Sequence, residues 1–152
     1  MNRRRRDGID PVLRARARRR ALQAVYAMQM SGVDAEGAIA QFAHEQAREP
    51  ADLAYFEDLV RGVYARRREL DAALAPFLDR AIDEVDQIER AMLRIAAYEL
   101  RHRLDVPYRV VIDEAINVVK RFGSEHGHTY VNGVLDRAAA DWRSVEVRAQ
   151  RA

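Results

Sequence analysis

The chain has 152 residues, a length typical of one domain that buries about 70% of its unfolded surface. It has no cysteine, which excludes disulfide bonds and thiolate metal sites. No apolar run approaches the roughly 20 residues of a membrane span, and none follows the basic start as in a secretory signal. We therefore expect a cytoplasmic protein without a membrane partner.

Charge is distributed unevenly along the sequence. Residues 1–20 contain nine arginines and two aspartates, a net charge of +7, whereas the whole chain carries only +2. Residues 21–152 therefore carry a net charge of −5. A basic leader on a mildly acidic body indicates a polyanionic partner, and it leaves a second, basic protein partner open.

The first predicted elements are a leader and a helix. Residues 1–10 are expected to be disordered, because adjacent arginines repel one another and nothing apolar anchors them. A helix should then run from Pro11 to about Met30, with Asp10 as its cap and Gly32 at its end. Its inner face should consist of Ala17, Ala21, Ala24, Val25 and Met28, and its outer face of Arg16, Arg19, Arg20 and Gln23.

Two further helices are predicted before the middle of the chain. A short one should cover about residues 34–48, and Pro50 separates it from a long helix over 53–74. The long helix should not continue past Pro76, and a turn or short helix over 77–83 follows.

The stretch over residues 86–103 is predicted to be the central helix. Its apolar side chains cover two nearly opposite faces and leave only a ridge of Arg90, Arg94 and Arg101 for water. A helix that is apolar around most of its circumference is normally buried among others. Glu99 lies on an apolar face of this helix. Since a buried carboxylate needs a partner, we expect a structural ion pair there.

Two more helices complete an all-α fold. One should begin after Pro107 and end at Gly123, and the other should cover residues 130–142 after a loop at 124–128. Residues 148–152 are expected to fray. Strand-like alternation is absent from the sequence, which predicts a single helical domain over residues 11–147.

Enzymatic chemistry finds little support in the sequence. Three serines, one threonine and four histidines show no local signature of a catalytic triad, and there is no glycine-rich phosphate loop. His126 and His128 are better explained as exposed loop residues than as metal ligands. Asp113 and Glu114 point about 100° apart on a helix, so they do not form a catalytic pair. No catalytic residue, metal or cofactor is predicted.

The arginine-rich start is the strongest functional signal from residue types alone. Arginine binds phosphate bidentately and stacks on bases, which favours RNA or DNA as the partner. A second group, Lys120, Arg121 and Tyr130, combines positive charge with an aromatic ring on which a base could stack. The alternatives are a solvated helix face for the arginines and an ordinary packing role for Tyr130.

Five segments of the sequence form a characteristic series: RARARRRALQAVY (14–26), YFEDLVRGV (55–63), LRIAAYEL (93–100), DVPYRVVIDEAINVVKRFG (105–123) and YVNGVLDRAA (130–139). In this order they resemble the NusB family of transcription antitermination factors. The resemblance implies about seven helices in two packed subbundles. It also implies a non-enzymatic protein that pairs with NusE, a small-subunit ribosomal protein, and binds single-stranded boxA RNA. By the same resemblance, the pair is expected to join an antitermination complex on RNA polymerase, notably at ribosomal RNA operons.

The resemblance also implies an RNA site. It assigns the first-helix arginines Arg14, Arg16, Arg18 and Arg19 to this site, together with Tyr130. With Lys120 and Arg121, these residues are predicted to form one continuous site. The sequence departs from the family pattern where Tyr130 replaces the usual phenylalanine, where Thr129 replaces a basic residue, and in the extension over residues 1–13. Surface carboxylates of the third and central helices are predicted contributors to binding NusE.

Two other functions are compatible with the sequence. NusB-like domains also form the RNA-binding part of ribosomal RNA cytosine methyltransferases, although no Rossmann-type cofactor domain follows here. The other is a helical module whose main role is to form a homodimer through an apolar face. The sequence does not decide between monomer and homodimer.

Overall fold

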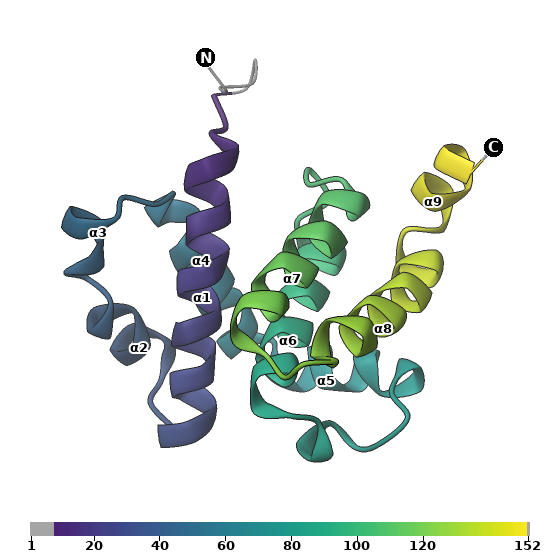
Figure 1. Ribbon diagram of the computed structural model, residues 1–152, viewed down its shortest axis with the longest axis horizontal. Coiled ribbons are helices and arrows are strands. Elements are labelled where there is room, and N and C mark those ends of the chain that lie inside the picture. The colour runs from purple at the N-terminus through teal and green to yellow at the C-terminus, as the bar shows by residue number, and fades with distance from the viewer. Residues whose placement is uncertain (1–7, 152) are drawn as a thin grey trace. The chain divides into compact units, whose positions relative to one another are not determined.

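The computed structural model describes residues 8–151, which form nine α-helices and two short 3-10 helices, η1 (Ala75–Phe77) and η2 (Ile82–Glu84), without a strand (Figure 1). This confirms the predicted all-α fold. The chain divides into two compact units, an N-terminal unit up to Ala65 and a C-terminal unit from Arg66. Most of the predicted leader, residues 1–7, lies outside the described residues, as does the final residue of the predicted frayed tail.

The N-terminal unit is organised around helix α1 (Pro11–Ser31), which packs against α2 (Ala35–Gln41) and α4 (Leu53–Ala65). Both predicted ends of α1 are confirmed. The Asp10 carboxylate accepts hydrogen bonds from the main chain at Val12 and Leu13, as an N-cap residue does. Gly32 ends the helix with a φ of 75°, a left-handed conformation that glycine adopts without a steric penalty.

Two predicted helices of this region are each interrupted. The chain bends after α2, and a separate short helix, α3 (Glu45–Arg48), follows. The Phe42 N–H donates to the Ile39 carbonyl three residues back, a 3-10 bond that tightens and ends α2. The long third helix is likewise divided at Arg66, where φ is −112° and ψ is 19°. No residue type at Arg66 signals such a break.

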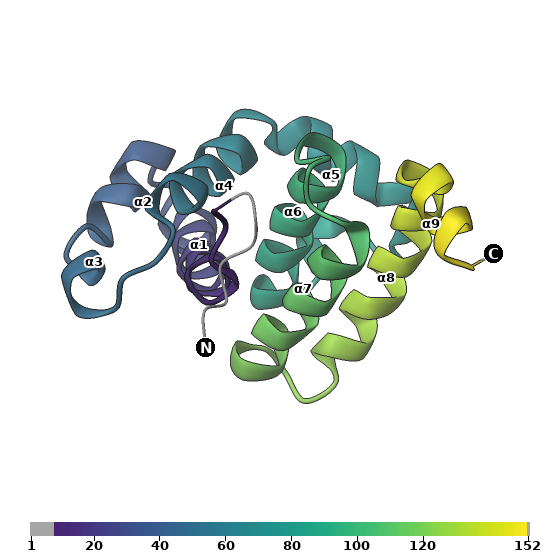
Figure 2. The same ribbon diagram turned by 90° about the horizontal axis from the view of Figure 1, so that it is seen from above.

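Helix α6 (Gln87–His102) is the most buried helix among the described residues, as predicted. Ten of its 16 residues are buried, and Leu93, Ala97 and Leu100 have no exposed surface. It contacts α5 (Arg67–Leu74), α7 (Tyr108–Phe122) and α8 (Gly127–Trp142), and Figure 2 shows α6, α7 and α8 side by side.

The predicted arginine ridge of α6 is half-buried instead of open to water. Arg94 forms a two-pronged ion pair with Asp71 of α5, with N–O distances of 2.8 and 2.9 Å. Arg90 donates to main-chain carbonyls of the segment around η2 (Ile82–Glu84), and the Arg101 guanidinium lies 5.0 Å from the centre of the Trp142 ring. The ridge is therefore covered by neighbouring elements of the same unit.

The end of the described chain also differs from the prediction. Residues 144–151 form helix α9 (Ser144–Arg151), which contacts α8, where the sequence predicted a tail that frays after Val147. Val147 is only 3% exposed and anchors this helix. The sequence signal was weak because α9 has a single buried apolar side chain. No helix within residues 8–151 is long and apolar enough to cross a membrane.

Candidate nucleic-acid interface

The α1 arginines that the sequence assigned to RNA binding lie against carboxylates of their own unit. Arg19 pairs with Glu49 at 2.9 Å, and Arg16 approaches the same carboxylate at 3.7 Å. Arg14 pairs with Asp52 at 3.4 Å, and its guanidinium stacks 3.9 Å from the centre of the Tyr55 ring. About a third of the Arg16 and Arg19 side chains is exposed, so their guanidinium groups remain accessible from solvent.

Arg18 does not fit the predicted role. Only 2% of the residue is exposed, and its guanidinium donates to the Tyr55 hydroxyl at 3.4 Å. Arg20 was predicted on the outer face of α1 but is also buried, beside the ring of Phe56. It donates to the Gln46 side chain and to the Glu49 carbonyl. In this conformation the two arginines hold the unit together and are not available to a phosphate.

Main-chain contacts fix the segment that carries the carboxylates, residues 49–52. The Gln46 amide donates to the Ala51 carbonyl at 3.0 Å, and the Ala51 N–H donates back to Gln46 at 3.3 Å. The Asp52 N–H donates to the Leu13 carbonyl of α1 at 3.0 Å, and Arg16 donates to the Pro50 carbonyl at the same distance. Sequence reasoning missed this segment, because no spacing rule links residues about 30 positions apart.

The second predicted group lies in the C-terminal unit. Lys120 and Arg121 occupy the last turn of α7 and are exposed, at the helix end where positive charge is favourable. Tyr130 lies near the start of α8 and is half-buried. Because the α1 arginines belong to the other unit, the continuity of the predicted RNA site stays a prediction.

Tyr130 is held by two residues that sequence reasoning did not identify. Its hydroxyl donates to Asp79 at 3.1 Å, and the Arg80 guanidinium lies 5.1 Å from the centre of its ring. Arg80 forms a two-pronged pair with Asp79, and this pair together with the Tyr130 hydrogen bond lowers the pKa of that carboxyl to about 2. Burial raises the pKa of the Tyr130 hydroxyl, as does its bond to Asp79. The ring is therefore presented beside a fixed positive charge.

A buried carboxylate shapes the loop that leads to Tyr130. Glu89 of α6 is 3% exposed, and it accepts a hydrogen bond of 2.7 Å from the Ser124 hydroxyl. Burial raises the pKa of Glu89, and a hydrogen bond with Asp86 acts in the same direction. A Cβ added at Gly127 would overlap the Glu89 carboxylate, so any larger residue there would force that side chain to move. The sequence singled out Glu99 as a buried carboxylate but not Glu89.

Glu99 is fully buried, as its position on an apolar face predicted. Its predicted ion pair stays a prediction. The other carboxylate within α6, Glu89, is also buried, so the exposed carboxylate of the predicted central stretch is that of Asp86, the N-cap residue of α6. The contribution of this helix to binding a protein partner stays a prediction.

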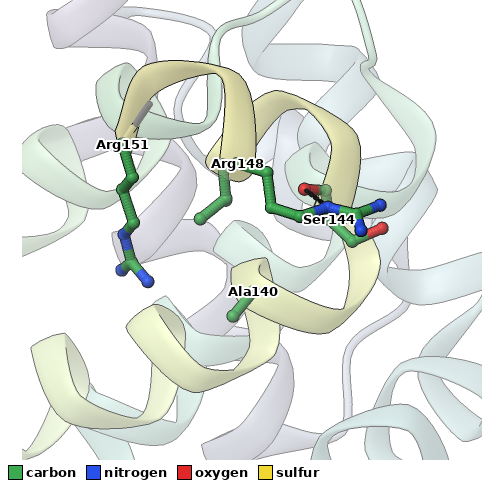
Figure 3. A pocket seen from close by; sticks show the side chains of 5 residues that line it. Ala140, Ser144, Arg148 and Arg151 are labelled. Carbon is green, nitrogen blue, oxygen red and sulfur yellow. Dashed lines mark hydrogen bonds between the residues drawn. The ribbon is translucent and has the colours of Figure 1, made fainter.

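One surface hollow lies apart from every predicted site residue. Figure 3 shows it between α8 and α9, lined by Ala140, Ser144, Val147, Arg148 and Arg151. The Arg148 side chain there donates to the Ser144 carbonyl of its own helix. Within residues 8–151, no three histidine or acidic side chains come together as a metal site.

A model described as the NusB family matches residues 15–140. The chain belongs to the NusB family. Transcription antitermination protein NusB of Stenotrophomonas maltophilia (strain K279a) is 74% identical over 142 residues, which are 93% of this chain and 89% of the relative. The protein of the same name in Xanthomonas oryzae pv. oryzae (strain PXO99A) is 75% identical over 93% of this chain and 91% of the relative. The solved structure of T. maritima NusB is 30% identical, with a TM-score of 0.71 over 84% of this chain and 90% of that one.

Membership of the NusB family confirms the resemblance stated from the sequence motifs. The matched region contains both groups of predicted RNA-binding residues except Arg14, which lies one residue before it. The predicted role in transcription antitermination is supported by relatives that carry this name at about three-quarters identity. NusB proteins are transcription factors and not a family of enzymes.

Proposed function

We propose that the protein is a non-enzymatic, cytoplasmic RNA-binding adaptor of transcription antitermination. With NusE it binds single-stranded boxA-type RNA and joins the antitermination complex on RNA polymerase, especially at ribosomal RNA operons. The observation that carries the proposal is the α1 arginine row, in which Arg16 and Arg19 present partly exposed guanidinium groups.

The pairing of these arginines is compatible with RNA binding. Exposed ion pairs contribute only about 0–1 kcal/mol, so Glu49 restrains the Arg16 and Arg19 guanidinium groups without sequestering them. The Arg14–Asp52 pair is more buried, with 13% of the Arg14 side chain exposed. Arginine then offers several N–H donors to phosphate oxygens. Contacts of this kind supply affinity and position the RNA, with little dependence on its sequence.

The C-terminal unit offers a surface for an unpaired base. The Tyr130 ring supplies a stacking face, and the exposed Lys120 and Arg121 supply positive charge for the phosphates that flank the base. In this proposal, α1 binds the RNA phosphates, and Tyr130 at the start of α8 stacks on a base.

The acidic body supports a basic protein partner such as NusE. The carboxylates within α6 are buried, so the proposed contribution comes from exposed acids outside it, such as Glu69 of the predicted third helix and Asp83, Glu84, Asp86 and Asp113. An electrostatic contribution of this kind makes association faster at low ionic strength. Size-exclusion chromatography with and without RNA distinguishes this adaptor from a module that only forms homodimers.

The deciding experiment is a fluorescence titration of a labelled boxA-type RNA with the full chain, with and without NusE, over a series of salt concentrations. The double variant Arg16→Ala/Arg19→Ala should weaken binding and flatten the slope of log affinity against log salt by about 1.4, about 0.7 for each lost phosphate contact. Arg68→Ala, which removes an exposed arginine of α5, is the matched control and should behave as the parent. If the double variant equals the parent, α1 is not the phosphate-binding element.

A further inference from the structure

The Glu49 carboxylate pairs with Arg16 and Arg19, whose guanidinium groups bind RNA phosphates in the proposed function. It lies 2.9 Å from Arg19 and 3.7 Å from Arg16. A carboxylate and a phosphate offer guanidinium the same chemistry, a pair of anionic oxygens that accept parallel N–H bonds. The two anions therefore compete for the same donors.

The position of Glu49 is set by the fold and not by the ion pair alone. Its main-chain carbonyl accepts a hydrogen bond from the buried Arg20, whose guanidinium also binds the side chain of Gln46. Gln46 in turn is bonded in both directions to Ala51. Main-chain contacts on both sides therefore hold Glu49 over the arginine row.

The Glu49 side chain nevertheless remains free to leave. Just over half of it, 55%, is exposed, so its carboxylate can turn into water without losing buried contacts. Exposed pairs of this kind are weak and are screened by salt. The main-chain contacts thus keep Glu49 within reach of Arg16 and Arg19. Its side chain can still turn between these arginines and water.

We propose that Glu49 takes the place of an RNA phosphate in the free protein and is displaced from Arg16 and Arg19 when RNA binds. The inference rests on the proposed function. A tethered carboxylate has a high effective concentration, so a single small anion displaces it poorly. A strand that presents successive phosphates to both arginines displaces it readily. Glu49 therefore selects against small anions and lowers the affinity for RNA.

The variant Glu49→Gln tests this exchange in the RNA titration described above. It should bind about two- to fivefold more tightly than the parent at low salt, the range expected for releasing an exposed ion pair, and the gain should shrink as salt screens that pair. The slope of log affinity against log salt should therefore steepen by no more than about 0.7, because the same arginines contact phosphate in both complexes.

Two further variants separate the local contact from net charge. Glu36→Gln makes the same change in charge in the same unit, but Glu36 pairs with Arg61 of α4 and not with α1, so its affinity should stay within about 1.5-fold of the parent. Glu49→Asp keeps the charge but shortens the side chain, and it should show part of the gain in RNA affinity expected for Glu49→Gln. Urea unfolding should show all three variants folded, because the changed groups are exposed.

The possible outcomes are distinct. If Glu49→Gln binds like the parent or more weakly, the inference is overturned and the proposed function stands. A salt slope for Glu49→Gln that is steeper by about 1.4 or more also overturns it, since the parent complex would then lack the two phosphate contacts. If Glu36→Gln gains as much RNA affinity as Glu49→Gln, the gain comes from net charge and not from the Glu49 contact, and the inference is overturned. If the parent itself does not bind RNA with or without NusE, the proposed function fails and the inference fails with it.

Discussion

Arg143 and Glu146 form an ion pair of 2.6 Å that joins two helix ends in the C-terminal unit. The Arg143 guanidinium, on a residue only 7% exposed, donates to the carbonyls of Leu100 and Val106 and to two others at the end of α6. Glu146 accepts a hydrogen bond of 2.8 Å from the Tyr108 N–H at the start of α7. The Arg143 cation thus binds carbonyl groups at the C-terminal end of α6, and the Glu146 anion binds an N–H group at the N-terminal end of α7. Both placements are favoured by the helix dipoles.

Replacing Arg143 should be the most damaging single change near the end of the chain. Arg143→Ala removes the guanidinium donor of the Leu100 and Val106 carbonyls, whereas the Glu99 and Arg103 carbonyls keep main-chain donors. We expect it to lower the free energy of unfolding by at least about 3 kcal/mol. The stability of Arg143→Lys should lie between that of the parent and that of Arg143→Ala, because an ammonium group does not reproduce the planar set of guanidinium donors. Urea unfolding followed by circular dichroism measures both. Arg148→Ala, on the exposed side of α9, is the control and should change stability by less than about 0.5 kcal/mol. A parent-like midpoint for Arg143→Ala would mean that water replaces the guanidinium.

The stability of the protein should fall as Glu89 ionises. Its pKa is raised in the folded state, chiefly by burial. A group with a raised folded pKa contributes stability that is fully present below the unfolded value of 4.5 and is lost as the pH rises through the folded value. Glu89→Gln does not ionise, so its melting temperature relative to the parent should increase from pH 4 towards pH 7. A difference between the two proteins that does not change with pH would contradict the assignment. Glu125→Gln, in the exposed loop, serves as the control.

Tyr130 should act in RNA binding through its ring and not through its hydroxyl. Tyr130→Phe removes the bond to Asp79 but keeps the stacking face, so RNA affinity should stay within about twofold of the parent. Tyr130→Ala should cost about 1–3 kcal/mol of binding free energy. Neither change should alter the salt slope, because no phosphate contact is lost. Equal losses for both variants would instead assign the role to the hydroxyl and its contact with Asp79.

Glu99→Ala should destabilise the fold without affecting RNA affinity. Glu99 has no exposed surface, and removing one partner of a buried charge pair costs about 3–5 kcal/mol. The measurement is the urea midpoint together with RNA affinity at a temperature where the variant is folded. A variant as stable as the parent would show that Glu99 forms no stabilising pair.

The parts of the fold that local sequence determines were predicted well. The caps of α1 at Asp10 and Gly32 depend on side chains and backbone preferences within a few residues. The burial of α6 follows from apolar residues on two faces of one helix, which periodicity alone reveals. The breaks after α2 and at Arg66 were missed, because no proline or glycine lies at either position.

The candidate site was predicted in its residue types but not in its contacts. Periodicity placed the arginines on α1, but the burial of Arg18 and Arg20 depends on elements about 30 residues further along the chain. Tyr130 was identified from its motif, whereas Asp79 lies 51 positions away from it in sequence. Contacts of this kind depend on how helices pack, and helical periodicity carries no information about them.

The exposed end of α7 carries a unique site for amine-specific labelling. Lys120 is the only lysine among its 26 basic residues and is open to solvent. An amine-reactive crosslinker or dye therefore has one side-chain target in the whole chain, in the same unit as Tyr130. Labelling yield at Lys120 can report whether the proposed RNA or the proposed protein partner covers this end of α7. No engineered cysteine is needed for such an experiment.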